Sequence, residues 1–374
     1  MANIEKKPSW LTVRVPNSGQ AVAEQIGTIL VRRRLHTVCD EARCPNRTEC
    51  WSTGAVTFML MGDICTRSCR FCAVRSAREG QPLDMAESEA IAGAAEELGL
   101  SYVVLTSVDR DDLVDRGAGH FASCIGALKR RIPGVRVEAL IPDYTEQELA
   151  PILAAAPDVI ACNVETVRSL QWIRDSRASF DKTLDTLRAV KSLAPGKSPA
   201  VKTSFMLGLG ETEAELLAAM DELRAVGVDI LVMGQYLRPS PRQIPVSAYI
   251  PPEQFERLAQ AARTRGFTSV IAAPLARASY HAQEGYARVE AVGKPAGAKL
   301  IRVKADVEGG VIRSIQIRGD FFASPEDAFE RVERRLAGVF LTDIAAAFDA
   351  LLLQEGVDAC GISGAALAEI LNNL

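Results

Sequence analysis

The chain has 374 residues, a length that allows one large domain plus a small one. Its 43 lysines and arginines against 47 aspartates and glutamates give a formal net charge of -4. The pI near 5.7 disfavours a generally basic nucleic-acid-binding protein, although a local basic face stays open. The amino terminus lacks the apolar core of a signal peptide and no uncharged apolar run is long enough to span a bilayer, so we expect a cytoplasmic protein without nucleic-acid or membrane partners.

The first predicted helix covers residues 21–34, and three cysteines follow it. Cys39, Cys44 and Cys50 have the spacing C-x4-C-x5-C. Cysteines in a chain without an export signal are more often metal ligands or free thiols than disulfides. Because three thiolates leave a four-ligand site one ligand short, the missing ligand must come from elsewhere in the chain or from solvent.

A second cysteine triplet follows an apolar strand predicted at 56–61. Cys65, Cys69 and Cys72 have the spacing C-x3-C-x2-C. Soft thiolates suit iron-sulfur clusters, and a cluster held by three of them keeps one iron open for another ligand. A structural zinc site is the alternative, but it usually has four ligands in paired C-x2-C units, and only Cys69 and Cys72 have that spacing. We therefore favour an iron-sulfur site.

Strand-like runs and amphipathic helices alternate after residue 56. The predicted strands are 56–61, 102–106, 135–140, 159–163, 201–207 and 229–233, and helices such as 87–98 and 211–226 lie between them. Repeated units of this kind predict a parallel α/β sheet covered by helices, either an open doubly wound sheet or a partial barrel. Ligands of both architectures bind beyond the carboxyl ends of the strands, where the loop of Cys65 lies.

Three of these strand ends carry polar or glycine-rich segments. The turn 109–112 holds three aspartates and an arginine, which by themselves favour a solvated, self-paired loop. Asn163 and Glu165 follow the fourth strand and are suited to hydrogen-bond a ribose or an ammonium group. Gly208, Gly210 and Glu211 follow the fifth, where glycines permit close approach to a flat ligand, although a tight turn explains them equally well.

The carboxyl-terminal part has a different pattern. After a linker at 293–297, residues 299–307 and 311–318 alternate like paired strands, and a helix is predicted with Ser324 as its cap. Helices are expected at 343–354 and 364–374. We expect Cys124, Cys162 and Cys360, and also Trp10, Trp51 and Trp172, to be core packing residues.

From about residue 8 to residue 286 the motifs together resemble lipoyl synthases, a family of radical S-adenosylmethionine (SAM) enzymes. The matching strings are HTVCDEARCPNRTECW, GDICTRSCRFC, TSVDRDDL, NVETV, GLGET, GQYLRPS and ASYHA. The resemblance implies a (β/α)6 partial barrel at 55–292 after an amino-terminal extension at 1–54. It also implies a sulfurtransferase that inserts two sulfur atoms at C6 and C8 of an octanoyl group on a carrier-protein lysine.

This resemblance gives both cysteine triplets a role. Cys65, Cys69 and Cys72 would hold a [4Fe-4S] cluster whose open iron binds SAM. The triplet of Cys39, Cys44 and Cys50 would hold an auxiliary [4Fe-4S] cluster that donates sulfur. The fourth auxiliary ligand in the family is a serine of an Arg-Ser-Ser-Tyr motif, which here reads Arg-Ala-Ser-Tyr at 277–280, so Ser279 takes that role and Ala278 is a departure.

Other roles implied by the resemblance are less specific. The SAM-pocket candidates are Ser107, Asn163, Glu165, Gly208, Gly210 and Glu211, and the acidic turn 109–112 becomes part of the active-site rim. After Lys202 the chain has Thr203 and Ser204, where the family commonly has serine and glycine. The implied partners are an octanoylated carrier (the glycine cleavage H protein or a 2-oxoacid dehydrogenase E2 lipoyl domain), a ferredoxin or flavodoxin, and an iron-sulfur carrier.

The segment 298–374 resembles the small carboxyl-terminal domain of lipoate-protein ligases, on the string IRGDFF at 317–322 and the helices after it. The chain has no ligase adenylation core, so we expect no ligase activity. Engagement of the carrier protein and a passive stabilising role both stay open for this segment.

Two other functions are compatible with the cysteines. One is a different radical SAM enzyme, such as a methylthiotransferase acting on transfer RNA, which should show a basic RNA-binding module. The other is a non-catalytic iron-sulfur or zinc scaffold, which needs no SAM-pocket residues at successive strand ends.

Overall fold

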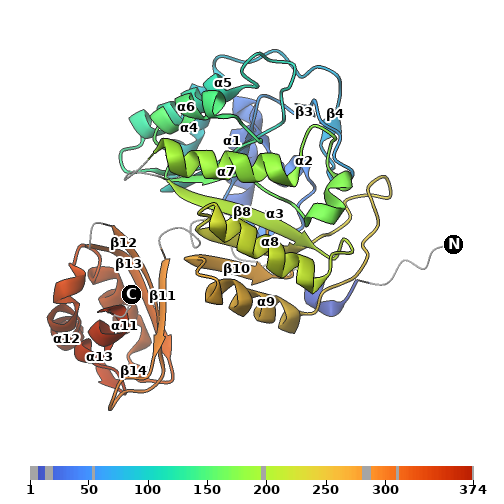
Figure 1. Ribbon diagram of the computed structural model, residues 1–374. Coiled ribbons are helices and arrows are strands. Elements are labelled where there is room, and N and C mark those ends of the chain that lie inside the picture. Colours follow the sequence, from blue (N-terminus) through green and yellow to red (C-terminus); the bar gives the residue numbers. More distant parts are fainter. Residues whose placement is uncertain are drawn as a thin grey trace. The chain divides into compact units, whose positions relative to one another are not determined.

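The computed structural model describes residues 7–12, 20–52, 55–194, 199–279, 288–308 and 311–372. The chain forms two compact units, Met1–Gln283 and Glu284–Leu374 (Figure 1). Each unit has its own hydrophobic core, so each is described by itself.

The first unit is built on one sheet with the strand order β1-β2-β5-β6-β7-β8-β9-β10. Its strands are β1 (His36–Thr37), β2 (Thr57–Leu60), β5 (Tyr102–Ser107), β6 (Arg136–Leu140), β7 (Val159–Ala161), β8 (Ala200–Leu207), β9 (Ile230–Gln235) and β10 (Ser269–Ala273). Only β1 pairs antiparallel; all the others run parallel. Because the order never reverses, the sheet is a partial barrel and not a doubly wound sheet. Strand β10 is a further parallel strand at the edge of this sheet, beside the six that the sequence predicts.

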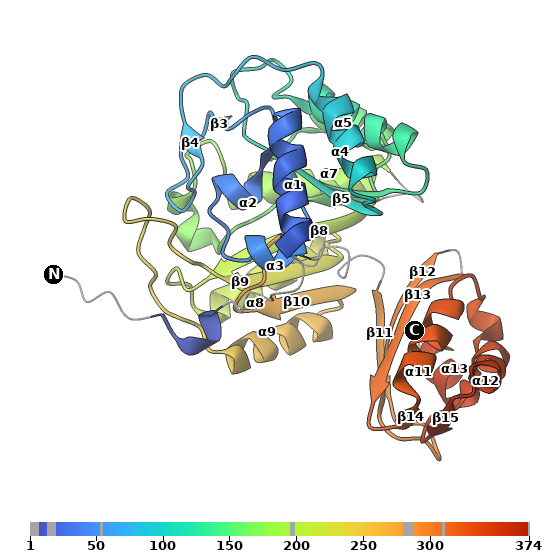
Figure 2. The same cartoon turned by 180° about the vertical axis from the view of Figure 1, so that it is seen from behind.

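Helices surround this sheet, and successive helices pack against their neighbours around it. The helices between strands are α4 (Glu87–Glu97), α5 (Ala118–Arg131), α6 (Glu146–Ala154), α7 (Phe180–Leu193), α8 (Glu213–Ala225) and α9 (Pro252–Thr264), and a 3-10 helix, η2 (Arg168–Ile173), precedes α7. Near the amino terminus lie η1 (Ser9–Leu11), α1 (Gln20–Arg33), α2 (Val38–Glu41) and α3 (Arg47–Ser52). In Figure 2, α1, α2 and α3 lie in front of the sheet, whereas α7 and α8 lie behind it. Burial on both faces explains the continuous apolar runs of β2 and β9, whose residues are all buried.

The second unit packs helices on an antiparallel sheet. The sheet has the order β11 (Arg288–Gly293), β12 (Ile301–Glu308) and β13 (Val311–Gly319), with a small ribbon of β14 (Phe322–Ser324) and β15 (Asp358–Cys360). The helices are α11 (Glu326–Arg335), η3 (Leu341–Asp343), α12 (Ile344–Glu355) and α13 (Gly364–Asn372). Together they enclose the apolar side chains that form the second core.

The boundary between the units differs from the sequence-based expectation. Residues 288–292, which were expected to belong to the barrel domain, form β11 together with Gly293 of the expected linker, and β11 pairs with β12. Ala291 is buried in the second core, so this strand belongs to the carboxyl-terminal unit. The cap of α11 is Pro325 and not Ser324, because Ser324 is paired with Asp358 at the end of β14.

Some expected core residues are exposed. Cys124, Cys162 and Trp51 are buried as expected. Cys360, at the end of the short edge strand β15, is exposed instead. Trp10 and Trp172 have 41% and 55% of their surface exposed, since both lie on short 3-10 segments at the surface. Among the described residues, no helix has the length and apolar character needed to cross a bilayer.

Candidate active site

The loop of the Cys65 triplet begins at a strained turn after β2. Met61 and Gly62 have positive φ angles of 67° and 83° and lead into β3 (Ile64–Cys65), which pairs with β4 (Arg75–Ser76). The Cys65 sulfur accepts backbone N–H groups of Arg67 and Asp109, each at 3.4 Å. Amide donors aimed at a ligand sulfur are the environment that tunes iron-sulfur clusters.

The other two thiols of this triplet lie in the same environment. The Cys69 sulfur accepts the backbone N–H of Asp175 at 3.3 Å. Burial is the main cause that raises the pKa of Cys65 to about 12 and that of Cys69 to about 11, and the nearby Cys72 raises both further. Metal binding releases protons from such thiols, because the bound form is the thiolate. Three neighbouring half-buried thiols, two of which accept backbone N–H groups, fit the cluster that the sequence predicts.

The second triplet is brought together by two short helices. Cys39 lies in α2 and Cys50 in α3, and Cys44 lies between these helices. Burial raises the pKa of Cys39 to about 11 and that of Cys50 to about 12, and the neighbouring thiols of the triplet raise both further. These three thiols therefore also form a candidate metal site.

The segment before Ser279 lies against this second triplet. The Asn46 side chain, two residues after Cys44, donates to the carbonyl oxygen of Leu275 at 2.6 Å. Burial lowers the pKa of Arg277, and Cys44 is close enough to oppose that shift. Ser279 follows two residues later, whereas Tyr280 and the rest of the ASYHA string lie outside the described residues. The predicted fourth ligand is thus in the loop that contacts the auxiliary triplet.

Two predicted SAM-pocket residues have unsatisfied buried oxygens. The hydroxyl of Ser107 and the side-chain carbonyl oxygen of Asn163 have no hydrogen-bond partner within the described ranges. Both lie where a parallel strand ends: Ser107 is the last residue of β5, and Asn163 follows β7 by two residues. Glu165 has a left-handed φ of 65°, which is uncommon outside glycine and is often found at functional sites. Burial raises the pKa of Glu165, while Arg174 lowers it in part. These groups fit a polar ligand at this edge of the sheet.

The glycine turn after β8 has a structural reason of its own. Gly208 has a φ of 91°, and a Cβ atom there would lie 2.2 Å from the carbonyl oxygen of Ala248. The Glu211 carboxylate accepts the backbone N–H groups of Gly208 at 2.6 Å and Leu209 at 2.9 Å. Glu211 therefore shapes the turn, and Gly208 lets the loop containing Ala248 approach it.

The acidic turn 109–112 is not the self-paired surface loop that its residues alone suggest. Arg67, from the cysteine loop, is buried and binds Asp111 through two hydrogen bonds of 2.9 Å. The same guanidinium lies 2.6 Å from Asp143 and 3.4 Å from Asp109. Only Asp112 pairs within the turn, with Arg110. The turn therefore fixes the cysteine loop on the barrel.

Sequence reasoning missed Arg67, Asp143 and Asp175 as parts of this site. Asp143 follows β6, so the rule that places ligands at strand ends was a signal for it. Asp175 accepts the backbone N–H of Ser68 at 2.9 Å and lies in a loop with no such signal.

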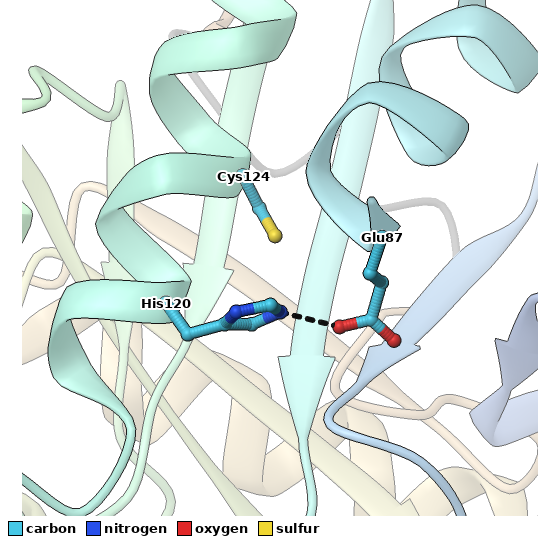
Figure 3. A group of neighbouring side chains, drawn as sticks. All are labelled: Glu87, His120 and Cys124. Carbon is cyan, nitrogen blue, oxygen red and sulfur yellow. Dashed lines mark hydrogen bonds and ion pairs between the residues drawn. The ribbon is translucent and has the colours of Figure 1, made fainter. Parts of the chain in front are cut away.

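A further group of metal-ligand types lies between α4 and α5. The ligand atoms of Glu87, His120 and Cys124 all lie within 4.8 Å of one another. Figure 3 shows these side chains pointing toward one another from the two helices. The Glu87 carboxylate is 2.6 Å from His120 Nε2 and accepts the backbone N–H of Met61 at 3.0 Å. We assign this group as an anchor for the turn that precedes the cysteine loop.

Comparison with known proteins decides the family. The Radical SAM superfamily model matches residues 59–223. A lipoyl synthase from Methanocella arvoryzae is 48% identical over 286 residues, which is 76% of this chain and 95% of that protein. The chain belongs to the lipoyl synthase family. A second family member, from Thermus thermophilus, is 49% identical over 279 residues, or 74% of this chain and 85% of that protein.

Family membership confirms the predicted reaction class and cofactors. The chain is a radical SAM enzyme that inserts sulfur to make the lipoyl group, and it uses SAM and [4Fe-4S] clusters. A transfer-RNA methylthiotransferase and a non-catalytic scaffold are thereby set aside. One solved structure, titled as a bi-partite lipoate protein ligase and its E2 lipoyl domain from Thermoplasma acidophilum, is 32% identical and matches 22% of this chain and 93% of its own, with a TM-score of 0.20.

Proposed function

We propose that this chain converts an octanoyl group on a lysine of a carrier protein into a lipoyl group, with the two cysteine triplets holding two clusters of different function. The observation that carries the proposal is the contact between the two ends of the first unit, where Asn46 beside the auxiliary triplet binds Leu275 in the loop of Ser279. A second thiol triplet with a serine-bearing loop against it is what a sulfur-donating cluster requires and a plain radical SAM barrel does not.

At the first site, Cys65, Cys69 and Cys72 are the proposed ligands of the SAM-binding cluster. The cluster and SAM, when bound there, would supply the radical chemistry needed to remove hydrogen from alkyl carbons that no acid-base side chain could deprotonate. The protein contributes orientation: Arg67 and Asp111 fix the cysteine loop through their paired hydrogen bonds of 2.9 Å.

The SAM molecule itself is proposed to bind at the neighbouring strand ends. Ser107 and Asn163 offer the unsatisfied buried oxygens, and Glu165 offers a carboxylate held at a strained backbone position. A carboxylate and a carbonyl oxygen accept hydrogen bonds from an ammonium group or from ribose hydroxyls. Gly208 and Gly210 keep the adjoining turn free of side chains.

At the second site, Cys39, Cys44, Cys50 and Ser279 are the proposed ligands of the auxiliary cluster. A hard serine oxygen is a poor match for a soft iron-sulfur unit, so it is displaced more easily than a thiolate. Easy displacement suits a cluster that gives up sulfur during turnover.

The partners follow from this chemistry. The substrate carrier is proposed to be a glycine cleavage H protein or a 2-oxoacid dehydrogenase E2 lipoyl domain, the electron donor a ferredoxin or flavodoxin, and the source of new auxiliary clusters an iron-sulfur carrier. The carboxyl-terminal unit is proposed to engage the substrate carrier, on the strength of its IRGDFF string.

Anaerobic turnover tests the proposal directly. The iron-reconstituted protein is incubated with SAM, dithionite and an octanoyl-lysyl carrier peptide, and peptide mass and 5'-deoxyadenosine are followed together. We expect the peptide to gain two sulfur atoms as deoxyadenosine is released. Deoxyadenosine without sulfur gain would contradict the substrate assignment, and the absence of both products would contradict the whole proposal.

A further inference from the structure

Exposed arginines gather around the cysteine loop of the first site. We call this group the arginine collar, and each of its members has an exposed side chain: Arg70, Arg75, Arg78, Arg177, Arg238 and Arg242. The whole chain carries a net charge of -4, so this local concentration of positive charge differs in sign from the protein as a whole.

The collar is held to the cysteine loop by backbone contacts. Arg70, between Cys69 and Cys72, donates its backbone N–H to Ile173 at 2.7 Å and accepts that of Ile244 at 3.1 Å. The side chain of Gln243, next to Arg242, donates to the carbonyl oxygen of Cys72 at 2.9 Å.

Two more arginines border the other side of the loop. Arg177 donates to the carbonyl oxygen of Thr66 at 2.6 Å. Arg75 lies opposite Ile64 in the pairing of β4 with β3, directly beside Cys65. Three segments distant in sequence therefore place arginines around the same three thiols.

An exposed tryptophan lies within the collar. Trp172 has 55% of its surface exposed, and the Arg70 guanidinium is 5.2 Å from the centre of its ring. Arginine and tryptophan are the side chains most enriched at protein-protein interfaces, whereas an exposed tryptophan contributes nothing to the core.

The collar keeps a positive excess after its local ion pairs are counted. Asp63 is bound by Arg75, and both Asp175 and Asp111 pair with Arg177. Arg78 and Arg242 have no ion pair within the described residues. An acidic partner would therefore meet uncompensated positive charge next to the cysteine loop.

We propose that the arginine collar is the docking surface for an acidic, low-potential electron-carrier protein. This rests on the proposed assignment of Cys65, Cys69 and Cys72 as cluster ligands. One electron passes from the reduced carrier to the cluster held by the loop, and the carrier is left oxidised by one electron. Complementary charge speeds such encounters by about 10-fold to 1,000-fold at low salt and orients the two proteins.

A charge reversal with a matched control tests the proposal. The double variant Arg78→Glu/Arg242→Glu reverses the charge of two collar members that have no ion pair within the described residues. The control Arg130→Glu/Arg263→Glu makes the same change of charge in the last turns of α5 and α9, at the opposite end of the barrel from the loop. The probe is a flavodoxin hydroquinone, and stopped-flow absorbance follows cluster reduction in the holoenzyme.

We expect the collar variant to lower the second-order rate constant by about tenfold or more at low ionic strength and the control to leave it nearly unchanged. The difference should shrink as salt is added, because salt screens exposed charges. Calorimetric titration with oxidised flavodoxin should show the same loss of affinity without any turnover. Trp172→Ser should weaken that binding without a change of charge.

Dithionite separates this proposal from the function itself. Being a small reductant, dithionite should reduce both variants at the wild-type rate and support the wild-type lipoyl yield. Equal slowing of collar and control variants with flavodoxin, or a slower reaction of the collar variant with dithionite, would overturn the proposal. A raised KM of the collar variant for the octanoylated carrier under dithionite would also overturn the proposal, because the collar would then bind the substrate carrier. Loss of sulfur insertion in the wild-type chain with dithionite would instead contradict the proposed function.

Discussion

Single residues far apart in sequence define the auxiliary site. Asn46 and Leu275 are 229 positions apart, yet their hydrogen bond of 2.6 Å joins the two parts of that site. Arg277 lies close to Cys44, and Ser279 lies two residues beyond it in the same loop. The departure from the family motif at Ala278 therefore falls directly before the proposed ligand, which makes the choice between these two positions testable.

Ser279→Ala is expected to leave SAM cleavage intact and to lower the lipoyl yield on the order of tenfold or more, because the auxiliary cluster loses its oxygen ligand. Deoxyadenosine release and product mass are measured together. Ala278→Ser restores the family string and serves as the control, with full yield expected. If Ala278→Ser rescued Ser279→Ala, a serine oxygen at either position could serve as the ligand; an unchanged yield in Ser279→Ala would remove Ser279 from the site.

Gly208 offers a second test at single-residue resolution, because its role combines backbone strain with a close contact. Gly208→Ala places a Cβ atom 2.2 Å from a backbone oxygen at a φ of 91°, whereas Gly99, at a φ of 65°, has no atom within 4 Å of that position. We expect Gly99→Ala to cost about 1 kcal/mol of unfolding free energy from strain alone and Gly208→Ala about 3 kcal/mol or more. Denaturant unfolding of the metal-free proteins measures both. Equal costs would show that the contact with Ala248 is not what requires glycine.

Helices α4 and α5 position the cysteine loop through the turn at Met61. Glu87 from α4 accepts the Met61 N–H at 3.0 Å and is held by His120 of α5 at 2.6 Å. The Met61 side chain also packs on Gly117 at the start of α5, where a Cβ atom would lie 2.3 Å from its sulfur. Two helices thus fix the strained turn between β2 and Cys65.

Glu87→Ala is expected to destabilise the first unit by about 3 kcal/mol, because it leaves the Met61 N–H and the His120 ring without their acceptor in a buried position. Glu89→Ala is the control: Glu89 lies on the same helix, its side chain is 60% exposed, and its ion pair with Arg130 is at the surface. Loss of that exposed pair should change stability by less than about 0.5 kcal/mol. Thermal unfolding midpoints compare the variants, and iron content after reconstitution reports on the loop. A Glu87→Ala protein as stable as Glu89→Ala would contradict the anchor.

The whole molecule combines a sulfur-inserting unit with a second unit that has its own core. Because Met1–Gln283 and Glu284–Leu374 each enclose separate apolar side chains, removing one should leave the other folded. The expected role of the second unit in engaging the carrier protein can therefore be tested by truncation.

A variant ending at Gln283 is expected to keep its iron content and its SAM cleavage. Its KM for an intact octanoylated carrier domain should rise several-fold, because contacts with the domain surface are lost. An octanoyl-lysyl peptide, which lacks that surface, is the matched substrate control and should be used as before. Equal KM values for the intact carrier with and without residues 284–374 would leave the second unit with a stabilising role only.

The sequence by itself determined the reaction class, because the metal ligands that a site can offer depend on residue type and on the spacing of those residues along the chain. Two cysteine triplets in order, with matching strand-end strings, were sufficient to predict the family, the partial barrel and its cofactors. The helices and parallel strands were also predictable, since their apolar periodicity is local. Strand β11 was missed because pairing with β12 is a tertiary contact, and its short pattern gave no signal of which sheet it would join.

Only the tertiary structure decided how the site is held. The aspartates at 109 and 111 turn inward because Arg67, more than forty residues earlier, is buried beside them and needs their charge. Trp172 lies at the surface rather than in the core because a 3-10 segment places its ring beside Arg70. Buried charge and exposed aromatic surface depend on which segments meet in space, and neither the spacing nor the composition of the chain contains that information.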